Sequence, residues 1–321
     1  MGTPPGYQDT YAFLLGYRDH HLPGKTVTFR ALQRLIDAID EQNLFLSDAD
    51  LPRKGLLVNA LTVNTMSYGF SILEDFLRIA DALIRCHDLH ELPHIILQYR
   101  RPGFFRDVAK QLANGQDPIV GRVLWYLSDK EVTELSFFSQ QEKQFIIRLH
   151  HDNIQHVRIL FRSLDRLYTA YSDAHNKYKH GYPFLFGETG SLSGTPLESL
   201  GVMIPYFCDS EAITKTGAIP VGPGVLRRLR TIIDGTGGLI SILQDVVSNS
   251  SFGCKIGGQR IVALQAFGPN ALDQKFMQEG NQLSERYLRT FGVTGVPEHL
   301  EMKIQSKVAR ANFEWLLQIP E

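Results

Sequence analysis

Cysteine is scarce in this chain of 321 residues. Its three cysteines, Cys86, Cys208 and Cys254, lie far apart and form no Cys-x-x-Cys pair. An odd number at such spacing argues against a disulfide framework and against a structural zinc site as the basis of the fold. We therefore expect the protein to work in a reducing compartment, the cytoplasm.

A basic leader and long apolar runs are missing as well. The first residues, MGTPPGYQDTYAF, contain no basic stretch followed by an apolar core, so we expect no signal peptide. No run approaches the roughly 18 apolar residues that a transmembrane helix needs. The sequence therefore predicts a soluble protein that does not associate with a membrane.

Neither sign of charge is in excess. The chain has 33 basic and 34 acidic residues, which gives a net charge of −1, and 43% of its residues are hydrophobic. This composition is typical of a soluble globular protein with one large or two ordinary domains. It argues against a surface that binds nucleic acid all over, although a local basic patch is compatible with it.

Apolar residues recur at helical spacing through most of the first 180 residues. The pattern predicts helices at 27–42 and 56–86, and shorter ones near 103–114 and 118–127. Gly69 is the residue that least suits the second of these helices. This succession of helices predicts an antiparallel helical bundle.

A longer helix follows at about 140–180. Ser139 and Glu142 have the Ser-x-x-Glu spacing of a capping box, which opens a helix. Gly181 and Pro183 close the helix, because glycine is the usual C-cap residue and proline prevents continuation. We expect this helix, at roughly 40 residues and about 60 Å, to be the central element of the bundle.

The pattern changes after Gly187, where loop residues and short β-like runs begin. We therefore predict a mainly α fold, with a helical bundle in residues 1–186 and a smaller α/β portion in residues 187–321. The segments expected in that portion are strands at 201–207, 217–221 and 260–267, and helices at 224–248, 271–289 and 299–318.

Four polar side chains cluster at the end of the long helix, in YSDAHNKYKHGYP. His175 and Lys179 share one helix face, and Asn176 and His180 share the adjacent face, because each pair is four residues apart. Such a cluster can hold a phosphate or a ribose hydroxyl. It can equally be ordinary capping, since the negative end of the helix dipole favours cations.

The stretch HNKYKHG, residues 175–181, resembles the motif of HEPN domains. These domains are helical bundles whose last long helix carries an arginine, a polar residue such as asparagine and, a few residues later, a histidine. The resemblance places His180 at the motif histidine and Asn176 at the polar residue, with His175 where arginine is expected. Glu74 and Asp75 resemble the acidic position that many members place opposite the motif.

The resemblance implies two alternatives for function. In the first, the chain belongs to a bacterial stress, toxin–antitoxin or antiphage defence system and binds RNA. It would then act as a metal-independent endoribonuclease if His175 or Lys179 supplies the positive charge of the missing arginine. In the second, the chain is a non-catalytic module that dimerises or holds a partner, and the motif is a cap and polar network.

The same resemblance implies a two-fold homodimer. Asn176 and Lys179 of both copies would line a shared cleft, with each His180 near its symmetry mate. We expect Glu74 or Asp75 to lie within reach of Lys179 or His180 in the same chain.

Other patterns in the sequence predict structure rather than chemistry. The glycines of IIDGTGGLI, residues 232–240, fit a tight connector between two helices and match neither a dinucleotide-binding nor a phosphate-binding loop. The spacing of Cys86, His87, His90 and His94 does not suit a metal site. We interpret the histidines of the long helix as surface or interface residues, and we expect no metal and no cofactor; these histidines are His150, His151 and His156.

Overall fold

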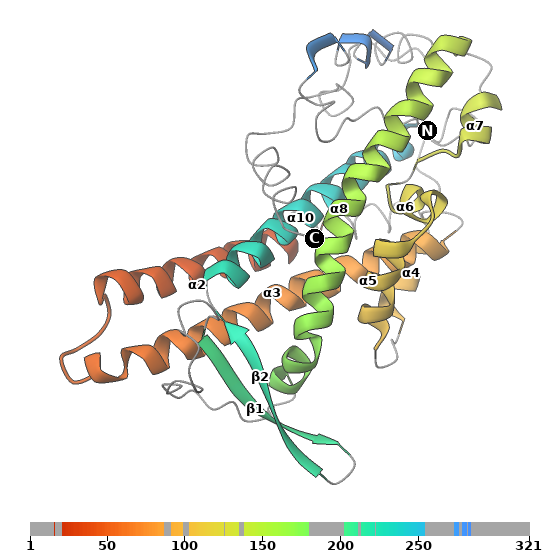
Figure 1. Ribbon diagram of the computed structural model, residues 1–321. Coiled ribbons are helices and arrows are strands. Elements are labelled where there is room, and N and C mark those ends of the chain that lie inside the picture. Colours follow the sequence, from red (N-terminus) through yellow and green to blue (C-terminus); the bar gives the residue numbers. More distant parts are fainter. Residues whose placement is uncertain are drawn as a thin grey trace. The chain divides into compact units, whose positions relative to one another are not determined.

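The computed structural model is mainly α-helical, as the sequence predicts (Figure 1). It describes residues 16, 21–86, 91–98, 103–124, 126–134, 138–179, 202–210, 213–221, 223–253, 273–275, 278–280 and 282–283. The elements in chain order are α2 (Leu22–Gln42), the short η2 (Leu51–Arg53), α3 (Lys54–Arg85), α4 (Leu92–Leu97), α5 (Phe104–Asn114), α6 (Asp117–Val123), α7 (Asp129–Glu134), α8 (Gln140–Lys179), β1 (Val202–Ser210), β2 (Ile213–Val221) and α10 (Pro223–Gly253).

Helix α8 begins with the predicted capping box. The Ser139 backbone N–H donates to Glu142 Oε2 over 2.8 Å, the Ser139 hydroxyl donates to the same oxygen over 2.6 Å, and the Glu142 N–H points back to Ser139 Oγ at 3.4 Å. Ser128 and Glu131 make the same reciprocal pair at the start of α7. These bonds satisfy backbone donors that a helix start would otherwise leave unpaired.

The chain divides into two compact units by its internal contacts. Unit 1 is built from Phe76–Asp165 and the described part of Asp234–Glu321, and unit 2 from His21–Asp75 and the described part of Arg166–Ile233. Both units take segments from either side of residue 187. The predicted division cuts the chain once, at 186/187, whereas each compact unit combines segments that are far apart in the sequence. The predicted domain boundary therefore stays a prediction.

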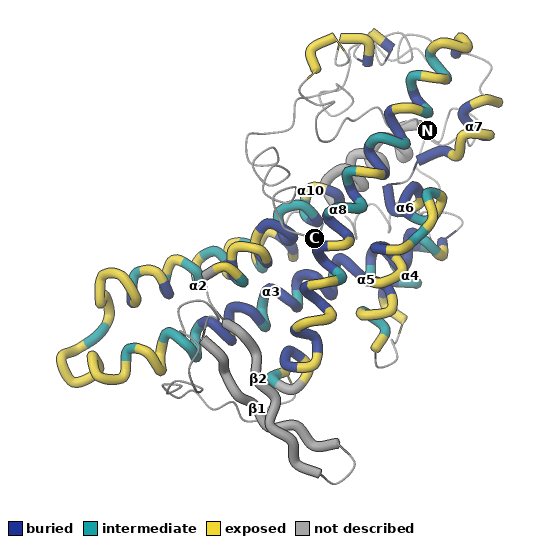
Figure 2. The backbone as a smooth tube through the Cα atoms, viewed as in Figure 1, coloured by how far each residue is buried: buried dark blue, intermediate teal, exposed yellow. Residues whose placement is uncertain are grey.

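Unit 2 is a bundle made by α2, the first part of α3, the last part of α8 and the start of α10. Each helix turns one apolar face inward, and these faces are buried along the shared core (Figure 2). The buried apolar side chains of this unit are Leu22, Phe29, Ile36, Ile39, Val63, Met66, Phe70, Ile72, Leu73, Leu167, Tyr168, Tyr171, Ala174, Leu226, Leu229, Ile232 and Ile233.

Gly69 permits close packing in the middle of this core. A Cβ atom at Gly69 would lie 2.4 Å from Cδ2 of Leu229 and 2.9 Å from Cε2 of Phe29. Both neighbours are fully buried, at 0% exposure, so neither can move aside freely. The glycine that least suits the helix by propensity is therefore required by the packing around it.

Helix α3 has a second noteworthy property, its apolar composition. By length and composition alone, Leu51–Arg85 is long and apolar enough to cross a membrane, and 44% of the relevant window is buried within the fold. Core helices of soluble proteins share this property. Leu73 and Leu77 of α3 are buried at 0% exposure, as expected of a core helix.

Unit 1 contains the rest of α3, helices α4 to α7, the first part of α8 and the rest of α10. Phe76 and Phe161 bring α3 and α8 together, with ring centroids 6.1 Å apart. Arg122 of α6 donates to the carbonyl oxygen of Ile84 over 2.7 Å. Other fully buried side chains of this unit include Ala80, Leu112, Val120, Val132, Ile146, Leu149, Val157 and Leu164.

The predicted connector at 232–240 is wrong, because α10 runs without interruption from Pro223 to Gly253. Ile233 and Leu239 are buried on either side of the glycines, so packing outweighs the low helix propensity. A Cβ at Gly235 would lie 2.9 Å from Cδ1 of the buried Leu160. Gly235 therefore allows α10 to approach α8 closely within unit 1.

Two glycines of α10 should respond oppositely to alanine. Gly237→Ala should raise the free energy of unfolding by about 0.5–1 kcal/mol, because a Cβ there meets nothing within 4 Å and alanine favours the helix. Gly235→Ala should lower it by about 1 kcal/mol, because the added carbon crowds Leu160. Urea unfolding followed by circular dichroism measures both, and equal effects would contradict the close packing at Gly235.

The two strands form an antiparallel hairpin. The register runs from Val202 opposite Val221 to Ser210 opposite Ile213. The β-like runs predicted at 201–207 and 217–221 fall in these strands, apart from Gly201, which is not among the described residues. The predicted strand at 260–267 and helix at 299–318 lie outside the described residues, as does most of the predicted helix at 271–289.

Candidate functional site

The polar cluster predicted from the sequence lies at the C-terminal end of α8, in unit 2. Helix α8 ends at Lys179, so His175, Asn176 and Lys179 belong to its last turns. His180 lies outside the described residues, as do Gly181 and Pro183. The site is therefore built from the first three of these residues and the part of α3 that faces them.

Glu74 of α3 is the centre of the site. The Tyr168 hydroxyl donates to Glu74 Oε1 over 3.1 Å, and Lys179 Nζ donates to Glu74 Oε2 over 3.1 Å. His175 Nε2 lies 3.4 Å from Oε1 of the same carboxylate. Glu74 is only 5% exposed, so three side chains of α8 surround a buried acid. The expected contact between Glu74 and Lys179 is confirmed.

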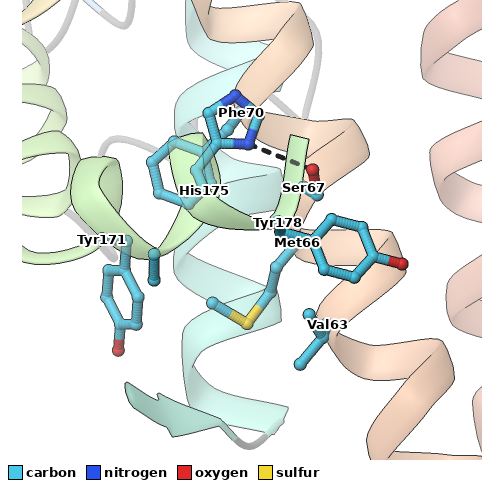
Figure 3. A pocket seen from close by; sticks show the side chains of 8 residues that line it. Val63, Met66, Ser67, Phe70, Tyr171, His175 and Tyr178 are labelled. Atoms are coloured by element: carbon cyan, nitrogen blue, oxygen red, sulfur yellow. Dashed lines mark hydrogen bonds between the residues drawn. The ribbon is translucent and has the colours of Figure 1, made fainter. Parts of the chain in front are cut away.

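His175 is a core residue. Its side chain is 3% exposed, and its ring stacks on Phe70 with centroids 5.4 Å apart and planes inclined by 27°. The Ser67 hydroxyl and His175 Nδ1 share a hydrogen bond of 3.1 Å, drawn in Figure 3. Nε2 makes no well-aligned hydrogen bond within the described residues, so its polar contact is with the Glu74 carboxylate at 3.4 Å.

A small pocket adjoins His175 (Figure 3). Its volume is about 10 Å³, which is room for about one water molecule and for no nucleotide. Apart from Ser67 and His175, its lining is mostly apolar or aromatic. The complete lining is Val63, Met66, Ser67, Phe70, Tyr171, Ala174, His175 and Tyr178.

The Glu74 carboxyl group is held in its ionised form. Burial acts to raise the pKa of Glu74, but the contact with His175 and its charge, together with the charge and hydrogen bond of Lys179, outweigh burial. The pKa of Glu74 is therefore lower than that of an ordinary glutamate. This arrangement is a buried acid with two basic partners, and its charges compensate each other.

Asp75 belongs to a different contact. His21 Nε2 lies 3.0 Å from Asp75 Oδ2, and Lys25 forms an ion pair with the same oxygen. Lys25 also donates to the Ser71 hydroxyl over 3.2 Å. Successive residues of a helix point about 100° apart, so Glu74 faces α8 while Asp75 faces α2. Of the two predicted acidic residues, only Glu74 joins the cluster.

The predicted site residues differ in accessibility. Asn176 is exposed and the Lys179 side chain is 50% exposed, whereas His175 is buried. A buried imidazole stacked on Phe70 does not present positive charge to a phosphate. This position argues against the expectation that His175 replaces the missing arginine at a scissile bond.

Sequence reasoning missed three members of the site: Ser67, Phe70 and Tyr168. A spacing of seven residues could have pointed to Ser67 and Tyr168. Ser67 precedes Glu74 by seven positions, and Tyr168 precedes His175 by seven. Residues seven apart lie on one helix face. Two polar pairs at this spacing on two helices indicate a shared buried network.

Comparison with known proteins does not name a family. No family model, curated protein or solved structure matches the chain. The resemblance to HEPN domains therefore stays a prediction, and function is argued from the site itself.

A second group of ionisable residues lines a pocket of about 580 Å³ in unit 1. His151 lies 3.0 Å from Asp129 and 3.4 Å from Asp117, and Arg158 binds Asp117 at 2.5 Å. The hydrogen bond with Asp129 raises the pKa of His151 against the opposing effect of burial. Within the described residues, no group of three His, Cys, Asp or Glu side chains could hold a metal ion.

The interpretation of the α8 histidines as surface or interface residues is wrong for His150. This residue is 2% exposed and stacks on Tyr126, with ring centroids 4.1 Å apart and planes inclined by 10°. Asn153 donates to the Tyr126 hydroxyl over 2.7 Å, and burial raises the pKa of Tyr126. His150 therefore packs in the core of unit 1.

Proposed function

We propose that this chain is a HEPN-like helical interaction module that holds a partner in the cytoplasm and has no ribonuclease activity of its own. The observation that carries this proposal is the burial of His175, the residue at the position of the family's arginine. A catalytic cation must reach the phosphate that it stabilises. His175 instead contacts Glu74, Ser67 and Phe70, all within the bundle.

Charge compensation supports the same proposal. Glu74 is ionised, and it faces Lys179 and His175 from the same chain. Such a network fixes how α3 and α8 pack in unit 2, since each polar group finds its partner only in one arrangement. The motif would then specify the bundle, and the bundle's outer surface would do the binding.

One observation favours RNA binding with metal-independent cleavage as a second candidate function. Asn176 is exposed and half of the Lys179 side chain reaches solvent, at the end of α8 that leads into His180. An amide and an ammonium group are suited to a ribose hydroxyl and a phosphate. Under this candidate His180 would be the general acid–base residue.

A ribonuclease assay in EDTA separates the two candidates. We expect the purified chain to leave a mixed RNA substrate intact, and His180→Ala to behave identically. His94→Ala is the matched control, because His94 is an exposed histidine of unit 1 and the motif belongs to unit 2. RNA cleavage by the natural chain and by His94→Ala, lost in a folded His180→Ala variant, would overturn the proposal in favour of the second candidate.

A further inference from the structure

Large apolar side chains are exposed where α2 connects to α3. The connection and the first turn of α3, residues 43–57, are called the α2–α3 tip, and this tip is mostly exposed in Figure 2. Phe45 is 80% exposed, which is far above the exposure usual for a phenylalanine. The other exposed apolar residues of the tip are Leu44 at 45%, Leu51 at 40%, Leu56 at 37% and Leu57 at 38%.

The backbone of the tip is strained at Phe45. Two residues here have positive φ, Asn43 at 52° and Phe45 at 66°. Asn43 suits this conformation, because it ends α2 with its N–H bonded to Ile39 and with the Leu44 N–H bonded to Ala38. Phe45 does not suit it, since a bulky side chain at positive φ is a genuine outlier. Within the part of the chain that the structure describes, little packing compensates the strain, because Phe45 is 80% exposed.

Charges of both signs follow Phe45 on the tip. Asp50 accepts a hydrogen bond from the Ser47 hydroxyl, and Lys54 binds Asp40, so these two charges have partners. Asp48 and Arg53 are exposed, and the side chains of both lack a polar contact with any other described residue. Among the described residues, the tip therefore carries one acid and one base without a polar partner on the same short segment as an exposed aromatic ring.

We propose that the α2–α3 tip binds the same tip of a second copy of this chain through a two-fold contact. In a two-fold contact the same patch of both copies meets, so that if an acid of one copy contacts a base of the other, the reverse pair forms as well. A patch with one acid and one base can therefore complement itself. Asp48 of each copy then pairs with Arg53 of the other, and Phe45 becomes buried between them. The contact stabilises the strained conformation of Phe45 that the isolated chain leaves uncompensated.

This inference deepens the proposed function, because it names the surface and the partner of the interaction module. It uses residues 43–57, whereas the dimer implied by the family resemblance uses residues 175–180. The experiments for this inference measure self-association, whereas the experiment for the proposed function measures RNA cleavage. The failure of one proposal can therefore be distinguished from the failure of the other.

Phe45→Asn should weaken self-association and leave the monomer as stable as the natural chain or more stable. Asparagine tolerates positive φ, so the variant removes strain while it deletes the aromatic anchor. Sedimentation of the full chain, from about 1 to 100 µM, should show a dissociation constant at least about tenfold higher for the variant. Thermal unfolding at the lowest concentration should give an equal or higher midpoint. A lower midpoint would mean that Phe45 serves the fold of the monomer, and the proposal would fail.

Charge reversal identifies the partner as a second copy. Asp48→Arg and Arg53→Asp should each weaken self-association, because each places like charges across the two-fold axis. The double variant Asp48→Arg/Arg53→Asp should restore self-association, with a dissociation constant within about threefold of that of the natural chain, because the acid and the base have only exchanged positions. A chain that stays monomeric over the whole range, or a double variant as weak as the single ones, would overturn the proposal.

Discussion

Replacing Glu74 with alanine should lower the free energy of unfolding by about 3 kcal/mol. The substitution removes a buried acid that accepts hydrogen bonds from Tyr168 and Lys179 and contacts His175. His175 and Tyr168 are buried, so the groups left without their partner pay the cost of desolvation. Lys179 is half exposed and adds little, because water solvates it once the pair is lost.

Asp75→Ala is the matched control for Glu74→Ala. It removes an acid at the next position of the same helix, and it should cost about 1 kcal/mol or less, because its partners His21 and Lys25 both reach solvent and are solvated by water once the acid is lost. Urea unfolding of both variants, followed by circular dichroism, measures the difference. Equal losses for the two substitutions would contradict the central position of Glu74.

The contribution of Glu74 should also depend on pH. Because the folded state lowers the pKa of this carboxyl, its stabilising effect is fully present above the unfolded pKa of about 4.3 and disappears as the pH falls through the folded value. Glu74→Gln removes the charge and keeps the volume. The stability difference between the natural chain and Glu74→Gln should therefore be constant near neutral pH and shrink below about pH 4.3. A difference that grows as the solution becomes more acidic would refute this assignment.

Gly69→Val should destabilise the chain by about 3 kcal/mol, the second large effect that we expect. A Cβ at this position would already lie 2.4 Å from Leu229 and 2.9 Å from Phe29, and valine adds two further carbons. Both neighbours are fully buried in unit 2, so relief requires the helices to move apart. Thermal or urea unfolding measures the loss.

Two further variants show whether crowding is the cause. Gly55→Val, in the first turn of the same helix, should change stability by no more than about 0.5 kcal/mol, because a Cβ there meets nothing within 4 Å. In a Leu229→Ala background, Gly69→Val should cost about 1 kcal/mol less than in the natural chain, since the neighbour that it strikes is smaller. Full additivity of the two substitutions would rule out the contact as the source of the loss.

The sequence predicted the long helices well because their signals are local, whereas the short helices α4 and α7 were not predicted and the helix expected at 118–127 ends at Val123. Ser139 and Glu142 open α8 within a single turn, and apolar spacing places its inward face. The connector expected at the glycines of 232–240 failed for the opposite reason. The stretch stays helical because Ile233 and Leu239 are buried in the fold and Gly235 packs closely against Leu160, 75 positions earlier in the sequence, and no local pattern reports this packing.

The candidate site was predicted in outline. The cluster on α8 and its contact with Glu74 followed from the motif and from the acidic pair on the earlier helix. The burial of His175 did not follow, because the same basic residue at a helix end suits both a solvated cap and a core network. Tyr168 was not predicted as a site residue, because a hydropathy pattern registers an aromatic ring at helical spacing and does not register its hydroxyl group.

The β1–β2 hairpin bears on aggregation, because strands of other molecules can pair with exposed strand edges. Among the described residues it is a sheet of two strands, so each strand is also an edge that a foreign strand can extend. Each strand contains a proline, Pro205 in β1 and Pro220 in β2, and proline has no amide hydrogen to donate. Each strand therefore lacks one backbone donor, which works against the addition of a foreign strand to the hairpin.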